Sequence, residues 1–98
     1  LDFWEIQDAI LALKKGKKYI DVIEVRTILI VSQGKKAIKA LVEEFLDKII
    51  VADGKITDAG KIFGKMFFKN KNKFTTCICA AEIPTIKDTM EIAKTFSP

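Results

Sequence analysis

The residues that are the best candidates for binding or catalysis lie in the segment Val51–Thr57, which has the sequence Val-Ala-Asp-Gly-Lys-Ile-Thr. The order Asp, Gly, polar, apolar, hydroxyl is also that of the second half of a calcium-binding EF-hand loop, in which the Gly permits a sharp bend. Aligned on Gly54, such a loop would need oxygen ligands where the chain has Ile49, Val51 and Gly60. Because these ligands are missing, we expect no metal ion and no other cofactor.

The same segment resembles the Ala-Asp-Gly-x-Ile-Ser/Thr connection between two helices in tellurite-resistance TerB-like domains and in short helical proteins of bacteriophages. The resemblance covers Ala52–Thr57, and it assigns any acidic role to Asp53 and Asp58. The residues themselves predict a structural turn between two helices. In that turn Asp53 closes the bend, Gly54 takes a positive φ and Thr57 caps the next helix.

Lysines line one face of the helix expected after this turn and continue into the polar loop behind it. We call them the basic ridge: Lys61, Lys65, Lys69, Lys71 and Lys73. Such a ridge could contact nucleic-acid phosphates or an acidic protein, or it could simply be a solvated helix face. The whole chain has 17 basic and 13 acidic residues, a net charge of +4, which is compatible with either interpretation. Since Arg26 is its one arginine, sequence-specific DNA recognition is not expected.

Two pairs of small residues are candidates for close contacts. Gly60 and Gly64 lie four residues apart on the predicted helix, so another helix, from this chain or a neighbouring one, could approach it closely. Cys77 and Cys79 would point to one face of a strand, but two thiols make only half of a tetrahedral metal site. We expect these cysteines to be small buried side chains.

Enzymatic catalysis finds little support in this composition. The chain has no His, which is the commonest general acid or base in enzymes. No glycine-rich loop that could cradle a phosphate is present. We therefore predict that the protein is not an enzyme.

The spacing of apolar residues predicts helices. Apolar residues at steps of three and four favour helices over about residues 3–15, 35–51, 58–68 and 85–96. Asp2 and Glu5 are spaced as a capping box for the first of them. Tyr19–Val31 is rich in β-branched residues, yet its polar residues recur every three positions, so a helix is favoured and a strand or hairpin stays open. Phe74–Ala81 fits a short strand or a weak helix.

The expected fold is an all-α bundle of four or five helices that forms a single domain over residues 1–98, with one short strand or hairpin as the alternative. The predicted function is that of a structural or protein-interaction subunit in a homo- or hetero-oligomer, such as a phage virion accessory protein. The alternative is a nonspecific nucleic-acid-binding module that uses residues 61–73. No apolar run is long enough for a membrane span, and Leu1 does not open a signal peptide, so a virion or the cytoplasm is the expected location.

Overall fold

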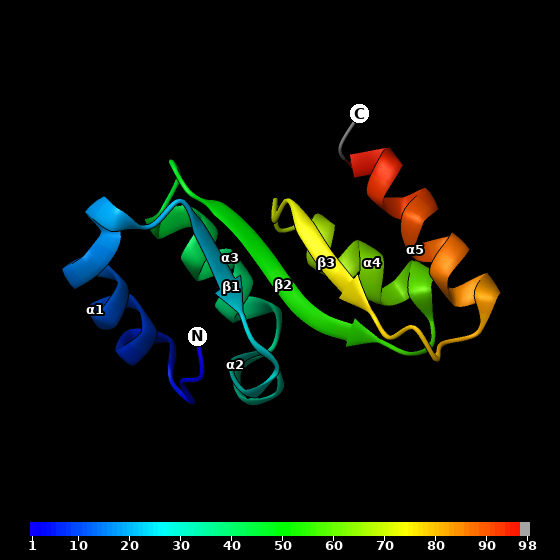
Figure 1. Cartoon of the computed structure of the whole chain (residues 1–98), viewed down its shortest axis with the longest axis horizontal. Coiled ribbons are helices and arrows are strands. Elements are labelled where there is room, and N and C mark those ends of the chain that lie inside the picture. The colour runs from blue at the N-terminus through cyan, green and yellow to red at the C-terminus, as the bar shows by residue number, and fades with distance from the viewer. Residues whose placement is uncertain (97–98) are drawn as a thin grey trace.

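A three-stranded parallel β-sheet with helices packed against it forms the centre of the computed structural model, which describes residues 1–96 (Figure 1). The strand order is β1-β2-β3, so β2 pairs with both of its neighbours. In chain order the elements are α1 (Ile6–Gly16), the short 3-10 helix η1 (Lys17–Tyr19), β1 (Val22–Val25), α2 (Thr27–Gln33), α3 (Lys35–Glu44), β2 (Ile49–Ile56), α4 (Gly60–Phe68), β3 (Phe74–Cys77) and α5 (Ile83–Phe96). The predicted all-α bundle is therefore wrong.

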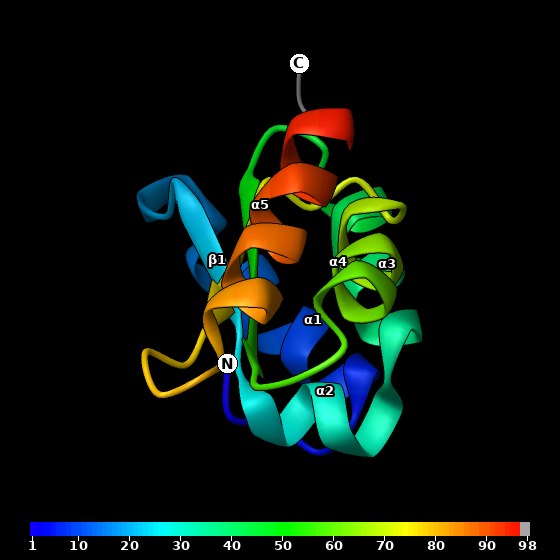
Figure 2. The ribbon, with the colours of Figure 1, turned by 90° about the vertical axis from the view of Figure 1, so that its right-hand side faces the viewer.

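The two faces of the sheet differ in character because side chains alternate along each strand. On β1, Ile23 and Val25 are buried, and on β2 the same is true of Ile50, Ala52 and Ile56. These side chains pack under the helices, which gives a core that α1, α2, α3 and α4 share with the sheet. Figure 2 shows α3 and α4 together on one side of the strands. Glu24 of β1 and Val51, Asp53 and Lys55 of β2 face the other side of the sheet.

The predicted helix over residues 35–51 is right only in its first part, since α3 ends at Glu44. Ile49, Ile50 and Val51 continue the apolar spacing of that helix, but they are β-branched and start strand β2. In β2, Ile49–Ala52 pair with β1 on one side, and Val51, Ala52 and Ile56 pair with β3 on the other. A central strand in a parallel sheet is buried on one face and carries an apolar run, which mimics a short buried helix.

The predicted turn at Ala52–Thr57 is also wrong. Asp53 and Gly54 lie inside β2, and positive φ occurs at Lys55 (46°), whereas Gly54 is not among the residues with positive φ. Thr57 does not cap the next helix, because α4 begins at Gly60 with Ala59 as its N-cap. The Asp-Gly pair is a common turn signal, but here tertiary pairing keeps the chain extended.

The two ambiguous segments both contain strands. Tyr19–Val31, for which a helix was favoured, contains β1 and then the first part of α2. Phe74–Ala81 contains β3. The first helix begins at Ile6 with Glu5 as its N-cap, which makes no capping hydrogen bond through its side chain, so the predicted capping box does not form.

Among residues 1–96, none of the helices combines the length and the apolar character that crossing a membrane requires.

Candidate active site

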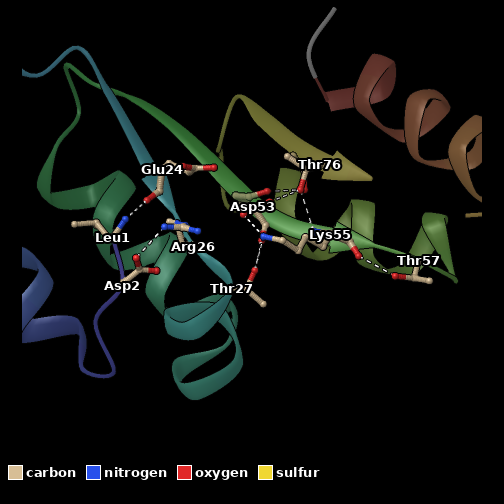
Figure 3. A network of polar contacts seen from close by, with 11 residues as sticks. Leu1, Asp2, Glu24, Arg26, Thr27, Asp53, Lys55, Thr57 and Thr76 are labelled. Carbon is tan, nitrogen blue, oxygen red and sulfur yellow. Dashed lines mark hydrogen bonds and ion pairs between the residues drawn. The ribbon is translucent and has the colours of Figure 1, made fainter. Parts of the chain in front are cut away.

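Polar side chains from all three strands gather at the edge of the sheet where the strands end. Thr27 follows β1, Asp53 and Lys55 lie in the last part of β2, and Thr76 lies near the end of β3 (Figure 3). We call these four residues the Asp53–Lys55 cluster. The carboxyl ends of parallel strands are where open α/β sheets and (β/α)₈ barrels bind ligands. The cluster is therefore the candidate active site.

The two charged residues share one face of β2 because they are two positions apart in a strand. Lys55 forms an ion pair with the carboxylate of Asp53 through Nζ and Oδ2. Asp53 is buried, with 7% of its surface exposed, whereas the Lys55 side chain is 47% exposed. The ammonium group thus has a buried anchor and still reaches solvent, as a group that contacts a ligand must.

Threonine hydroxyls complete the hydrogen bonding of this pair. Lys55 Nζ donates to Thr27 Oγ1 at 2.8 Å, and Thr76 Oγ1 donates to Asp53 Oδ1 at 2.6 Å. The backbone N–H of Lys55 donates to Thr76 Oγ1 at 3.0 Å. Thr27 Oγ1 also lies 3.3 Å from the Asp53 carbonyl oxygen, to which it donates. The carboxylate and the ammonium are therefore held in one arrangement by side chains from three strand ends.

The protonation of Asp53 follows from these neighbours. Burial by itself raises the pKa of the carboxyl group, but the hydrogen bonds from Lys55 and Thr76, together with the positive charges of Lys55 and Arg26, outweigh it. The net result is a pKa below the ordinary value of 3.8. Asp53 is therefore an ionised carboxylate at neutral pH.

Gly54 lets this part of β2 lie close to the helix layer. A Cβ at Gly54 would fall 2.3 Å from the ring of Phe67 in α4. Gly54 thus faces α4, and its two neighbours, Asp53 and Lys55, face the other side. In the segment for which a turn was predicted, the glycine therefore allows close packing of β2 against α4 and does not form a bend.

A second ion pair lies at the same edge of the sheet. Arg26, directly after β1, donates from Nη1 to Asp2 Oδ2 at 2.9 Å, and each of these side chains is 51% exposed. The Leu1 nitrogen donates to the Glu24 carbonyl oxygen at 2.8 Å, which places Asp2 beside β1 (Figure 3). Arg26 adds a cation next to the cluster.

The predicted site residues are only partly brought together. Asp53 is in the cluster, whereas Thr57 hydrogen-bonds the Lys55 carbonyl oxygen at 3.0 Å and Asp58 accepts from the Ala59 N–H at 2.7 Å. Gly60 and Gly64 face α5, since added Cβ atoms would fall 2.3 Å from the Thr85 carbonyl oxygen and 3.2 Å from Ile92, respectively.

The basic ridge lies away from the cluster. Lys61 approaches Asp88 of α5 at 3.9 Å. Lys65 and Lys69 line a groove with lysines of α3, and Lys71 and Lys73 lie in the loop that precedes β3. This loop is at the opposite end of β3 from Thr76.

Sequence reasoning missed Lys55, Thr27 and Thr76. The two-residue spacing of Asp53 and Lys55 could have indicated Lys55, because it places both side chains on one face of a strand. It carries no signal for Thr27 or Thr76. Within residues 1–96, no group of three or more His, Cys, Asp or Glu side chains lies close enough to hold a metal ion. Cys77 is half-buried and Cys79 is exposed, so the expectation that both are buried is wrong for Cys79.

Comparison with known proteins places the chain in an enzyme family. The family model described as orotidine 5'-phosphate decarboxylase / HUMPS family matches residues 1–98. A probable 3-keto-L-gulonate-6-phosphate decarboxylase from Mycoplasma pneumoniae is 45% identical over 98 residues, which is 100% of this chain and 45% of that protein. The 3-keto-L-gulonate-6-phosphate decarboxylase UlaD of Escherichia coli is 44% identical over 78 residues, which is 80% of this chain and 36% of that protein.

Solved structures agree with these relatives. A crystal structure of KGPDC from Streptococcus mutans superposes with a TM-score of 0.94 at 36% identity, covering 100% of this chain and 46% of that one. A 3-keto-L-gulonate-6-phosphate decarboxylase from Vibrio cholerae gives a TM-score of 0.95 at 35% identity, over 98% of this chain and 45% of that one. The chain spans less than half the length of these relatives, so a single complete domain over residues 1–98 stays a prediction.

These similarities overturn the functional predictions made from sequence. The relatives are enzymes, decarboxylases and 3-hexulose-6-phosphate synthases among them, so the predictions of a non-enzymatic structural subunit, of a phage virion protein and of a nucleic-acid-binding module are wrong. The resemblance to TerB-like domains is wrong as well, because five of its six residues, Ala52–Ile56, lie in strand β2 and do not connect two helices. Binding to other protein subunits stays a prediction. Since the family model matches the whole sequence, the chain belongs to the orotidine 5'-phosphate decarboxylase / HUMPS family.

Proposed function

We propose that the chain supplies the Asp53–Lys55 cluster to the active site of a decarboxylase that acts on a sugar-acid phosphate of the 3-keto-L-gulonate 6-phosphate type. The observation that carries this proposal is the ion pair at the carboxyl edge of the sheet, which combines a buried carboxylate with a half-exposed ammonium group. The names of the relatives at 44–45% identity support the choice of substrate. A cytoplasmic location also remains part of the proposal.

The chemistry of such a substrate explains why a fixed cation is useful. A 3-keto acid has its ketone two carbons from the carboxylate. When the bond between C1 and C2 breaks, CO₂ leaves and the electron pair moves onto C2 and the oxygen at C3. The resulting enolate then takes a proton at C2. Fixed donors or cations that face the developing oxyanion lower the barrier, because they need little reorganisation during the reaction.

Lys55 is the residue of this chain that fits that role. Its ammonium group is fixed by Asp53 and by the Thr27 hydroxyl, yet 47% of the side chain is exposed at the strand ends. Asp53 orients the ammonium group and keeps it paired when no substrate is bound. Arg26 has guanidinium N–H groups besides the one that contacts Asp2, and these can attract an anionic substrate to the same edge.

Turnover by the purified chain tests the proposal. The wild-type chain is mixed with 3-keto-L-gulonate 6-phosphate, and CO₂ release is compared with that of Lys55→Met. We expect the variant to be slower by about 10²–10³-fold, the usual loss when one group that stabilises an oxyanion is removed.

The matched control is Lys39→Met. Lys39 lies on α3, its side chain is 65% exposed, and it belongs to the groove between α3 and α4 instead of the cluster. We expect this control to keep the wild-type rate. Absence of CO₂ release from the wild-type chain, or equal rates for Lys55→Met and wild type, would contradict the proposal.

A further inference from the structure

The pairing between β2 and β3 is interrupted at the cluster. Ala52 pairs with Thr75 and Ile56 pairs with Cys77, so three residues of β2 (53–55) face a single residue of β3, Thr76. Such a bulge breaks the regular ladder of backbone hydrogen bonds and redirects the side chains of the longer strand. The backbone groups of the bulge must therefore find other partners.

The Thr76 hydroxyl is one of those partners. Its oxygen accepts the backbone N–H of Lys55 at 3.0 Å, which takes the place of a missing ladder bond, and its proton goes to Asp53 Oδ1 at 2.6 Å (Figure 3). One side chain thus contacts both members of the ion pair. It contacts the backbone of the lysine and the carboxylate of the aspartate.

Lys55 needs such a restraint because its backbone is in the left-handed region, with φ at 46°. A residue with a side chain is uncommon there, and the conformation persists only when the surroundings enforce it. On one side of Lys55 the Thr76 hydroxyl accepts its N–H, and on the other side the Thr57 hydroxyl donates to its carbonyl oxygen at 3.0 Å. These contacts fix the direction in which the Lys55 side chain leaves the strand.

We propose that Thr76 is a positioning residue, whose hydroxyl bridges the β2 bulge and sets the orientation of both Asp53 and Lys55 for the substrate. The proposal rests on the function proposed above. It differs from a general packing role, because the hydroxyl is required and the size of the side chain is not. Thr75 provides the comparison, since its hydroxyl donates at 2.9 Å to the Ala52 carbonyl oxygen and to neither charged residue.

The first test needs no substrate. In Thr76→Val, which keeps the shape but removes the hydroxyl, we expect the Lys55 amide to exchange with solvent about tenfold faster relative to the Leu41 amide in α3, as loss of one hydrogen bond implies. We also expect the pKa of Asp53, followed by carboxyl NMR, to rise, because one of the hydrogen bonds that lowers it is lost.

Two further variants make that test specific. Thr76→Ser restores the hydroxyl and should return both values to those of the wild type, whereas Thr75→Val should leave both unchanged. An unchanged Lys55 amide and Asp53 pKa in Thr76→Val would overturn the proposal. So would an equal effect of Thr75→Val.

The second test uses the decarboxylation assay. Thr76→Val should lower kcat about tenfold with little change in KM, because a misdirected Lys55 affects the transition state more than substrate binding. If Thr76→Val turns over as fast as wild type, the positioning role is overturned. If the wild-type chain releases no CO₂ but the exchange and pKa changes occur, the proposed function fails, and the restraint of Lys55 by Thr76 is supported.

Discussion

At the scale of single residues, the structure depends on how one buried carboxylate is satisfied. Asp53 is 7% exposed, and an unpaired charge at such a position would be costly. Each of its oxygens has a partner, since Oδ1 accepts from Thr76 and Oδ2 pairs with Lys55. The contact with Lys55 that makes Asp53 tolerable in the fold also holds the Lys55 ammonium group in place.

The lowered pKa of Asp53 predicts how stability depends on pH. A carboxyl group whose pKa is lower in the folded state stabilises the protein above its unfolded pKa, and this contribution is lost as the pH falls through the folded value. We expect Asp53→Asn to cost about 1.5–3 kcal/mol of unfolding free energy at pH 7, as for hydrogen bonds to charged groups. The difference from wild type should shrink as the pH falls below about 4. Urea unfolding at both pH values measures it.

Asp47→Asn is the control for that experiment. Asp47 contacts Lys48 at 3.4 Å but is 78% exposed, so solvent screens the interaction and little change is expected at either pH. If Asp53→Asn lost the same free energy at neutral pH and at about pH 3, the ionised carboxylate would not be what stabilises the cluster.

At the scale of elements, β2 and α4 can lie close together because Gly54 of β2 has no side chain. We expect Gly54→Ala to destabilise the protein by about 1–3 kcal/mol, the usual cost of overpacking, because the new methyl group would meet the Phe67 ring at 2.3 Å. Gly16→Ala is the control, since its Cβ would make an ordinary 3.7 Å contact with Ile20. Urea unfolding measures both.

A second substitution identifies the cause of that loss. Phe67→Leu removes the ring that the methyl group would meet, so in its background Gly54→Ala should cost clearly less than in the wild type. An equal cost in both backgrounds would show that the ring of Phe67 is not what excludes a side chain at position 54.

Helices and strands could be predicted from the sequence where the spacing of apolar residues fitted only one type of element. The spacing of apolar residues placed α3, α4 and α5 close to their observed positions, although not their exact ends. The apolar spacing gave the wrong element at Ile49–Val51, because a short apolar run fits the end of a helix and a central strand equally well. It failed again at Asp53–Gly54, where pairing with β3 on both sides of the two residues, at Ala52 and at Ile56, prevents the turn that the two residue types favour.

The candidate site was less predictable than the elements for a related reason. Thr27, Lys55 and Thr76 come from three separate segments, and nothing in the local sequence of each indicates that they meet. The five lysines of the basic ridge form a far more conspicuous pattern in the sequence, yet they lie on α4 and in the segment between α4 and β3, away from the cluster. The polar cluster lies at the ends of parallel strands, which a helical prediction cannot bring together.

At the scale of the whole molecule, the described fold has two polar surfaces. The Asp53–Lys55 cluster lies at the carboxyl ends of the parallel strands, and a lysine-rich groove lies between α3 and α4. The groove between α3 and α4 has Lys35, Lys36 and Lys39 on one side and Lys65 and Lys69 on the other. Both surfaces carry positive charge, so an anionic substrate could be drawn to either. We propose that the substrate binds at the strand ends.

This binding site can be tested by following the backbone amide NMR shifts of the chain while 3-keto-L-gulonate 6-phosphate is added. We predict shifts at Thr27, Lys55 and Thr76, and their loss in Lys55→Met. Shifts confined to Lys36, Lys65 and Lys69 in the outer groove, or no shifts at all, would contradict an active site at the carboxyl edge of the sheet.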